Sequence, residues 1–319
     1  MDEGDKEMEY PKKIAIGFQE GTCPLQCAKC FAFSKKAVRK KAVVKMPLDK
    51  AKMLIDEIAL MEKKPKIQPH IFTEPFANAD LPQIIEYCLD RDIHMSVITN
   101  GILLDDDWIA FLIHELNREY TISFSLDAIT QETYEKVRGK YDLKNLEEKI
   151  CYIIHNRKDK GPRVGVNFAI EEANYAEADA FIEKWKYKVD AVRIDTAFNF
   201  EKKIPFKLYM ENQNANVKCG HLEDVMTIDA DGQVRCCQLD AFGDTSLGNV
   251  FEEGILNVWR GPNMKMFRAK QERGLLAKED FCYGCEVPSM TNHTRYETDE
   301  FIINKAGHSI YYNYKGEIM

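Results

Sequence analysis

Short apolar segments alternate with amphipathic segments along the first two thirds of the chain. Apolar runs predict strands at 12–18, 70–73, 93–98, 120–126, 163–170 and 191–195. Apolar residues at helical spacing predict helices at 48–62, 81–89, 105–116, 131–137, 143–157 and 176–188. Strands that alternate with helices of this length favour a parallel sheet with right-handed crossovers.

This alternation gives about six strand–helix units across residues 12–196. A complete eight-unit barrel typically takes ~250 residues, so an incomplete barrel fits better. In such folds the chemistry lies at the carboxyl ends of the strands. A cysteine-rich loop follows the first predicted strand, and three other strand ends carry Thr73-Glu74-Pro75, Thr99-Asn100-Gly101 and Ser125-Leu126-Asp127. We therefore expect these segments to face one pocket.

The pattern changes from about residue 197. Residues 225–228 and 233–236 bracket Asp229-Ala230-Asp231-Gly232, which predicts a β-hairpin. Residues 255–271 have a helical pattern, and Ala306-Gly307 marks a second turn in a polar and aromatic stretch. The predicted fold class is therefore α/β, a partial (β/α)6 TIM-like barrel over 12–200 followed by a small α+β domain over 201–289. Residues 1–11 and 290–319 are expected to be tails.

Charge and hydropathy narrow the class of protein. The 319-residue chain has a formal net charge of −8, which argues against general nucleic-acid binding because that needs a basic surface. No apolar run approaches the ~18 residues of a membrane span. The first 13 residues are acidic and polar, without the apolar core of a signal peptide. We expect a cytoplasmic protein that binds neither nucleic acid nor membrane.

Cysteine is the most informative residue type in this chain. Cytosolic proteins seldom use disulfides, so grouped cysteines suggest metal binding or catalysis. Cys23, Cys27 and Cys30 form C-x3-C-x2-C after the first strand. Three thiolates leave one coordination position empty, whereas structural zinc sites normally have four ligands. A three-cysteine [4Fe–4S] cluster has an open iron that can bind a cofactor. A zinc site or a loop of free thiols is the alternative.

At this motif the sequence resembles the radical S-adenosylmethionine (radical SAM) superfamily. The resemblance covers residues 12–196 and implies a partial (β/α)6 barrel with a three-cysteine [4Fe–4S] cluster. In the family, the open iron binds the amino and carboxylate groups of S-adenosylmethionine (SAM). An electron from the cluster then cleaves SAM to methionine and a 5′-deoxyadenosyl radical, which abstracts a hydrogen atom from an unactivated carbon.

The resemblance also implies which residues contact SAM. Glu74 matches the acidic end of the family's Gly-Gly-Glu motif, which holds the SAM amino group. Ser125 matches a SAM contact, and Arg138 lies where an arginine pairs with the SAM carboxylate. A helix-end cation beside Gly139 is the alternative role of Arg138. Asn100 and Asn167 are further candidates at strand ends.

Two departures from the family pattern concern the same pocket. Phe72 and Thr73 replace the glycines of the Gly-Gly-Glu motif, so the backbone approach to SAM is expected to differ. The position before the third cysteine is commonly aromatic in the family, but here it is Lys29. Phe31, just beyond the motif, is then the candidate to cover the adenine.

A second group consists of Cys219, Cys237, Cys282 and Cys285. By itself this spacing also suits a zinc ribbon. Behind a radical SAM barrel it resembles the SPASM/twitch extension, which holds auxiliary [4Fe–4S] clusters. No cysteine follows Cys285. We therefore expect one auxiliary cluster with four cysteine ligands, which accepts an electron from a substrate radical or relays electrons to the first cluster.

Cys236 is the candidate catalytic residue, and its role is open. It could replace its neighbour Cys237 as a ligand, because adjacent strand residues face opposite ways. It could instead donate a hydrogen atom to a substrate radical, as in radical SAM epimerases, or be a small buried hydrophobe. Cys88 and Cys151 lie in helical patterns and are expected in the core.

These features predict a radical SAM enzyme that oxidises (dehydrogenates) or epimerises a small carbohydrate-like or aminocyclitol-like molecule. The alternatives are a maturase that epimerises or crosslinks a ribosomal peptide, and a non-catalytic iron–sulfur or zinc-binding scaffold. The expected partners are a small-molecule or peptide substrate and an electron donor such as flavodoxin or ferredoxin. The basic run between Lys35 and Lys45 could attract that donor or an acidic substrate, and an ordinary solvated face is the alternative.

Overall fold

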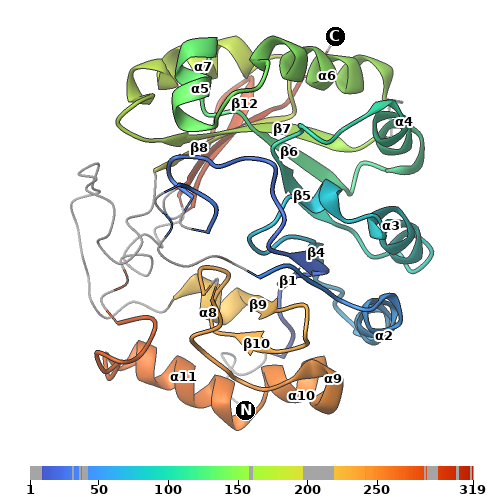
Figure 1. The fold of residues 1–319 in the computed structure, drawn as a ribbon, viewed down its shortest axis with the longest axis vertical. Helices are drawn as coiled ribbons and strands as arrows, with labels where there is room; N and C mark the ends of the chain where they lie inside the picture. The colour runs from blue at the N-terminus through green and yellow to red at the C-terminus, as the bar shows by residue number, and fades with distance from the viewer. Residues whose placement is uncertain are drawn as a thin grey trace. The chain divides into compact units, whose positions relative to one another are not determined.

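The computed structural model describes residues 9–30, 32–35, 37, 42–157, 161–196, 219–240, 242–283, 285, 294–306, 309–316 and 318. The chain divides into two compact units, each of which gathers distant stretches of the sequence (Figure 1). Unit 1 comprises residues 1–23, 39–96 and 213–289, and unit 2 comprises residues 24–38, 97–212 and 290–319.

Unit 1 contains a four-stranded sheet in the order β10-β9-β1-β4. Its strands are β1 (Lys13–Ile16), β4 (Lys66–Gln68), β9 (Val225–Ile228) and β10 (Val234–Arg235). β1 pairs in parallel with β4 on one side and with β9 on the other. The predicted hairpin is confirmed, because β9 and β10 pair antiparallel. The hairpin that precedes Cys236 and Cys237 therefore extends the sheet of the first strand.

Helices and a second strand pair complete unit 1. A short antiparallel pair follows β1, formed by β2 (Gln19–Glu20) and β3 (Val44–Lys45). Glu57 links the early helices to the late ones, because its Oε1 accepts from the backbone N–H of Ile255 at 2.6 Å. The helices are α2 (Leu48–Ala59), η1 (Pro75–Ala77), α3 (Leu81–Leu89), α8 (Gly220–Asp224), α9 (Val250–Glu253), α10 (Ile255–Trp259) and α11 (Pro262–Glu272).

Unit 2 is built on the sheet in the order β11-β12-β13-β8-β7-β6-β5. The first residue of β5, Ser96, is assigned to unit 1, and the rest of that strand belongs to unit 2. β6, β7 and β8 pair in parallel, as the sequence predicts. The strands are β5 (Ser96–Thr99), β6 (Thr121–Ser125), β7 (Arg163–Ile170), β8 (Ala191–Thr196), β11 (Thr294–Glu297), β12 (Phe301–Ala306) and β13 (Ser309–Tyr314). The helices are α4 (Asp106–Glu115), α5 (Gln131–Val137), α6 (Leu143–Asn156), η2 (Tyr175–Glu177) and α7 (Ala178–Trp185).

One face of the unit 2 sheet is apolar and covered by helices. α5, α6 and α7 lie over this face of β7 and β8 (Figure 1). Phe168 of β7 packs on Phe181 of α7, with ring centroids 4.9 Å apart. Two helices of unit 2 begin at capping side chains: Asp105 accepts from the N–H of Trp108 at the start of α4, and Thr130 accepts from that of Thr133 at the start of α5.

The structure corrects three expectations, two of them for local reasons and one through a long-range strand pairing. The strand predicted at 70–73 is wrong, because the strand is β4 at Lys66–Gln68, where Pro65 and Pro69 bound a segment with one fully buried residue, Ile67. The helix predicted at 255–271 is two helices, because Pro262 cannot continue α10 and starts α11 instead. The stretch expected as a C-terminal tail contributes β11, β12 and β13, and β13 pairs antiparallel with β8.

A buried ion pair network links the beginnings of β7 and β8 to two arginines that follow α4 and α6. Asp190, which precedes β8, accepts from Arg118 at 2.7 Å, from both Nη atoms of Arg157, and from the N–H of Val164 at 2.7 Å. Burial alone would raise the pKa of Asp190, but the Arg157 and Val164 hydrogen bonds and Arg118 outweigh it. The net effect lowers the pKa of Asp190 below its usual value.

We predict that Asp190→Asn lowers the free energy of unfolding at pH 7 by about 3 kcal/mol, because it leaves Arg157 buried without its anion. Because the pKa of Asp190 is lower in the folded state than its value of about 3.9 in the unfolded state, the ionised carboxylate stabilises the fold at pH values above that unfolded-state pKa. That stabilisation is lost as the pH falls through the folded-state pKa. The gap between wild type and variant should therefore narrow between pH 7 and pH 3 in urea titrations. Glu132→Gln, which removes an exposed pair with Lys136, should leave stability nearly unchanged. Equal stability of Asp190→Asn and wild type at pH 7 would contradict the prediction.

Candidate active site

The loop that carries the early cysteines is anchored through its backbone. All ten cysteines of the chain are free thiols. In unit 2, the N–H of Cys30 donates to the carbonyl of Cys27 at 2.9 Å, and the N–H of Ala28 donates to the carbonyl of Val137 at 3.0 Å. Arg138 Nη1 donates to Cys27 Sγ at 3.8 Å. Burial raises the pKa of the Cys30 thiol. The second and third cysteines are thus tied to the end of α5.

The first cysteine belongs to unit 1, where its neighbour Thr22 is held by the segment that contains Glu74. The Thr22 carbonyl accepts from the N–H of Glu74 at 2.7 Å and from Thr73 Oγ1 at 2.9 Å. The Glu74 carboxylate is buried and accepts from the N–H of Phe76 at 3.4 Å. Phe72 adopts a φ of +43°, in the left-handed region that favours glycine. Phe72 therefore keeps a glycine-like backbone at a position where the family has glycine.

Two of the predicted SAM contacts lie in one row across the unit 2 sheet. Ser125 of β6 pairs with Asn167 of β7, Asn167 pairs with Arg193 of β8, and Arg193 pairs with Tyr311 of β13. Residues in register on neighbouring strands present their side chains to the same face. Phe124 and Phe168 alternate with this row and face the helices. The row is therefore a polar strip on the face opposite the helices.

The sequence did not predict the other two members of this row, Arg193 and Tyr311, as site residues. Arg193 Nε donates to Asp195 Oδ1 at 2.8 Å, and its Nη2 donates to Ser309 Oγ at 3.2 Å. The guanidinium carbon also lies 5.3 Å from the ring centroid of Tyr311. The available signal was the alternation of charge in the strand AVRIDT, where Arg193 and Asp195 break an otherwise apolar run.

Two further residues are predicted to contact SAM, Asn100 and Phe31. The buried side chain of Asn100 shapes the turn after β5, because its Oδ1 accepts from the N–H of Ile102 at 3.0 Å. Gly101 takes a φ of +73° in that turn, and a Cβ there would lie 2.6 Å from Leu146. Phe31 lies outside the described residues.

A buried carboxylate, Asp127, lies at the centre of the unit 2 part of the site. It follows β6 with a φ of +59° and is 1% exposed. Its Oδ2 accepts from Arg138 Nη2 at 2.6 Å and from Lys29 Nζ, and its Oδ1 accepts from the N–H of Ala169 at 2.7 Å. Burial would raise the pKa of Asp127, but Arg138 and Lys29 hold it below its usual value. Lys29 Nζ also lies 3.9 Å from Glu171 Oε1, and burial raises the pKa of Glu171.

The late cysteines include a close pair. Cys236 Sγ lies 3.8 Å from Cys282 Sγ, and Cys236 is buried. Cys237 Sγ accepts from the N–H of Leu239 at 3.4 Å. Burial raises the pKa of the Cys219 and Cys237 thiols, and the hydrogen bond with Cys236 raises the pKa of Cys282. Cys285 is exposed. The candidate catalytic cysteine thus lies against one of the predicted auxiliary ligands.

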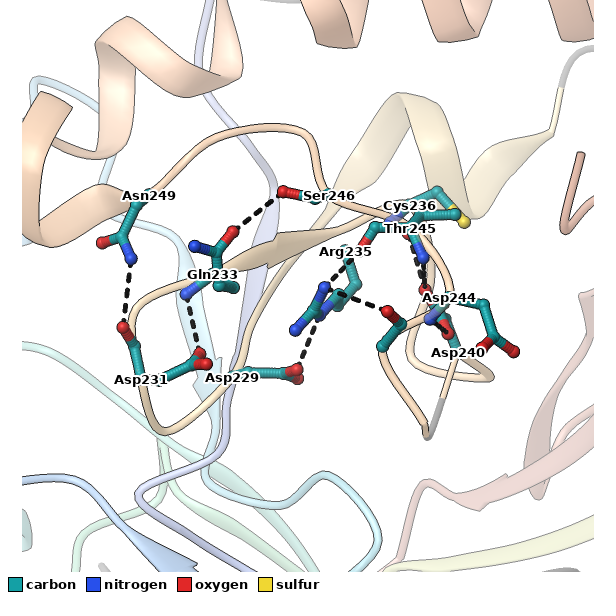
Figure 2. Close-up of polar contacts among 11 residues, drawn as sticks. Asp229, Asp231, Gln233, Arg235, Cys236, Asp240, Asp244, Thr245, Ser246 and Asn249 are labelled. Atoms are coloured by element: carbon teal, nitrogen blue, oxygen red, sulfur yellow. Dashed lines mark hydrogen bonds and ion pairs between the residues drawn. The ribbon is translucent and has the colours of Figure 1, made fainter. Parts of the chain in front are cut away.

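Asp240 organises the loop that follows Cys236 and Cys237 (Figure 2). Its Oδ2 accepts from the N–H and the hydroxyl of Thr245 at 2.8 and 2.6 Å, and its Oδ1 accepts from the N–H of Asp244 at 2.8 Å. Thr245 Oγ1 accepts in turn from the N–H of Cys236 at 3.0 Å. Arg235, between Asp229 and the carbonyl of Thr245, closes the loop from the other side. The buried carboxylate therefore fixes the backbone at the two adjacent cysteines.

The donor atoms fit the groups that the sequence predicts. Hydrogen bonds to sulfur stabilise cluster thiolates, and here Arg138 donates to Cys27 and Leu239 donates to Cys237. Arg138 Nε is buried without a hydrogen-bond partner, so it offers a donor to an added carboxylate. Within the part of the chain that the structure describes, no three His, Cys, Asp or Glu side chains form a site for a single metal ion.

Two protein-family models match the chain. The radical SAM superfamily model matches residues 21–178, and the SPASM iron–sulfur cluster-binding domain model matches residues 219–286. These matches agree with the resemblance inferred from the cysteine motifs. Among the helices of the described residues, none combines the length and the apolar character that a membrane span requires.

Curated relatives match part of the chain. Fe-coproporphyrin III synthase of Methanosarcina barkeri is 28% identical over 174 residues, which is 54% of this chain and 40% of the relative. The PqqA peptide cyclase of Granulibacter bethesdensis is 25% identical over 162 residues, which is 50% of this chain and 40% of the relative. The chain thus matches less than half the length of each relative.

Solved structures share the fold at low identity. BtrN in complex with AdoMet and 2-DOIA has a TM-score of 0.56 and 15% identity, over 86% of this chain and 93% of that one. SuiB of Streptococcus suis bound to its precursor peptide SuiA has a TM-score of 0.63 and 15% identity, over 88% and 71%. The enzyme anSMEcpe with bound AdoMet has a TM-score of 0.63 and 14% identity, over 86% of each chain. The predicted partial barrel followed by an auxiliary domain is confirmed.

The Asp240 network makes a prediction about the late cysteines. We predict that, in a Cys23/Cys27/Cys30→Ala background, Asp240→Ala removes more than about half of the remaining iron. The reason is that mutation of a residue that orients metal ligands typically lowers metal affinity about 10- to 100-fold. Asp244→Ala is the matched control, since its exposed side chain lies on the same loop. Iron and sulfide analysis of anaerobically reconstituted proteins provides the measurement. Equal iron in both variants would show that the loop does not support the ligands.

Proposed function

The chain belongs to the radical SAM superfamily and carries a SPASM iron–sulfur domain, and from that premise we propose that it oxidises a small polar molecule by hydrogen abstraction. The cofactors of these domains are a [4Fe–4S] cluster, SAM and auxiliary iron–sulfur. When bound, they supply the radical that takes one hydrogen atom from the substrate and an acceptor for one electron. Where the hydrogen atom comes from a carbon that carries a hydroxyl group, transfer of that electron and loss of the hydroxyl proton then give a carbonyl group.

We assign Cys23, Cys27 and Cys30 to the SAM-binding cluster, and Cys219, Cys237, Cys282 and Cys285 to the auxiliary cluster. Arg138 and Glu74 are proposed to hold the carboxylate and the amino group of SAM, and Ser125 and Asn167 to contact SAM from the polar strip. Arg138 Nε supports the first assignment, because it is a buried donor without a partner beside Cys27.

Oxidation is favoured over epimerisation by one contact, that of Cys236 Sγ with Cys282 Sγ at 3.8 Å. A hydrogen-atom donor has to face the substrate, whereas this buried thiol lies among the proposed auxiliary ligands. Arg193, Asp195 and Tyr311 extend the polar strip and support a substrate with hydroxyl or amino groups, such as an aminocyclitol. An electron donor such as flavodoxin or ferredoxin completes the proposed reaction.

Peptide maturation is the second candidate. It is supported by the likeness to the PqqA peptide cyclase and to SuiB, whose structure holds its precursor peptide. Both candidates need the same SAM cleavage, so a first experiment tests what they share and a second separates them.

We predict that wild-type protein, reconstituted without oxygen, binds about eight irons per chain, corresponding to two [4Fe–4S] clusters. The Cys23/Cys27/Cys30→Ala variant should keep about four irons and release no 5′-deoxyadenosine from SAM under reducing conditions. Cys151→Ala is the control, because this half-buried cysteine on α6 lies in neither group. Zinc in the triple variant, or the absence of any metal, would rule out the auxiliary cluster and with it the electron acceptor for oxidation.

The second experiment offers the protein a carbon-deuterated aminocyclitol and, separately, a ribosomal-type peptide. We expect the aminocyclitol to accelerate 5′-deoxyadenosine release and to transfer deuterium into it, and we expect Cys236→Ala to keep forming the oxidised product. Faster release with the peptide alone would favour maturation. Loss of product in Cys236→Ala, with solvent hydrogen returned to the substrate carbon in wild type, would favour epimerisation.

A further inference from the structure

Lys29 occupies the position before the third cysteine and is the least expected residue of the cluster loop. A lysine ammonium is strongly hydrated, so it is seldom buried unless an anion compensates its charge. Here the side chain is 21% exposed and lies against two carboxylates, Asp127 and Glu171. The burial and the two anions indicate that the lysine has a role inside the site rather than at its surface.

Asp127 is shared between two cations. Its Oδ2 accepts from Lys29 Nζ and, at 2.6 Å, from Arg138 Nη2. The arginine uses Nη1 for Cys27 Sγ at 3.8 Å and has no hydrogen-bond partner at Nε. The two Nη atoms of Arg138 therefore contact the Asp127 carboxylate and the Cys27 thiol, while its buried Nε–H remains available to donate to another acceptor.

The charges of this group show what the lysine contributes. Arg138 and Asp127 alone cancel, so a second anion would find no net attraction there. Lys29 adds one positive unit to this sum in either protonation state of Glu171. The total is then +1 when Glu171 is neutral and zero when Glu171 is ionised. Charge interactions are strong where side chains are buried, because the effective dielectric constant is well below that of water.

The backbone of the loop does not depend on the lysine. Hydrogen bonds from Ala28 to the Val137 carbonyl and from Cys30 to the Cys27 carbonyl hold it through main-chain atoms. Substitution of Lys29 is therefore expected to change the charge of the site while the loop and its thiols keep their place.

We propose that Lys29 is a positioning residue for SAM: it neutralises Asp127, so that Arg138 remains able to attract the SAM carboxylate. This inference rests on the proposed function, in which Arg138 takes that carboxylate. It assigns a role to the lysine that stands where an aromatic residue is common. The role is electrostatic, since the charge of Lys29 acts on SAM through Asp127 and Arg138.

The test is a double-variant cycle on anaerobically reconstituted protein. Dissociation constants for SAM are measured by calorimetry for wild type, Lys29→Met, Lys29→Arg, Asp127→Asn and Lys29→Met with Asp127→Asn. Iron content and the thermal midpoint are recorded for each protein. Lys184→Met is the matched control, because this partly buried lysine pairs with Glu147 on helices away from the loop.

Lys29→Met should weaken SAM binding about tenfold, the size expected for one charge-assisted interaction. Lys29→Arg and Lys184→Met should bind SAM nearly as wild type does. The double variant should recover most of the lost affinity, because removal of Asp127's charge frees Arg138 again. A purely structural lysine would give a double variant at least as weak as Lys29→Met.

Three results would overturn the proposal. The first is wild-type affinity in Lys29→Met at full iron content. The second is a double variant without recovery. The third is loss of iron from Lys29→Met that the double variant does not restore, since the lysine would then hold the loop itself. Failure of wild type to bind SAM would overturn the proposed function together with this inference, whereas the other results leave the proposed function intact.

Discussion

A buried carboxylate at the end of β6 organises unit 2 around the candidate site. An ionised aspartate this far from water is stable only with compensating charges and donors. Asp127 obtains them from three segments: Lys29 from the cysteine loop, Arg138 from the end of α5, and the N–H of Ala169 from β7. One buried charge therefore joins side chains or backbone groups from the loop, the helix and the strand, while main-chain hydrogen bonds hold the loop itself in place.

A second constraint is the position of β1 in unit 1. This strand pairs in parallel with β4, as a barrel strand would, and also with β9 from the late part of the chain. The β9–β10 hairpin leads directly into Cys236 and Cys237. Cys236 and Cys237 are thus attached to the sheet of the first strand through backbone pairing, and Asp240 and Thr245 then fix the local loop.

The site combines a common framework with residues particular to this chain. The three-cysteine spacing and the SPASM region belong to the superfamily, while Phe72 and Lys29 depart from its usual pattern. Phe72 keeps a left-handed backbone at a position where glycine is usual, so the local conformation is retained despite the change of residue. Lys29 replaces an aromatic surface with a charge, which changes the electrostatics beside Cys27 and Cys30. One departure is absorbed by the backbone, and the other alters the chemistry of the pocket.

The sequence by itself determined the features that repeat over short distances. Period-two and period-3.6 patterns located most strands and helices, and the cysteine spacings identified the superfamily and its cofactors. It failed at β4, where three residues between prolines carry too little pattern, and at the break between α10 and α11. Only the tertiary structure decided which distant residues meet: β9 beside β1, β13 beside β8, Arg193 in the row of Ser125 and Asn167, and Lys29 on Asp127. Local patterns follow from the geometry of one element. These contacts instead depend on strand register and on the compensation of buried charge between distant segments, the farthest of which pair Lys13 with Val225.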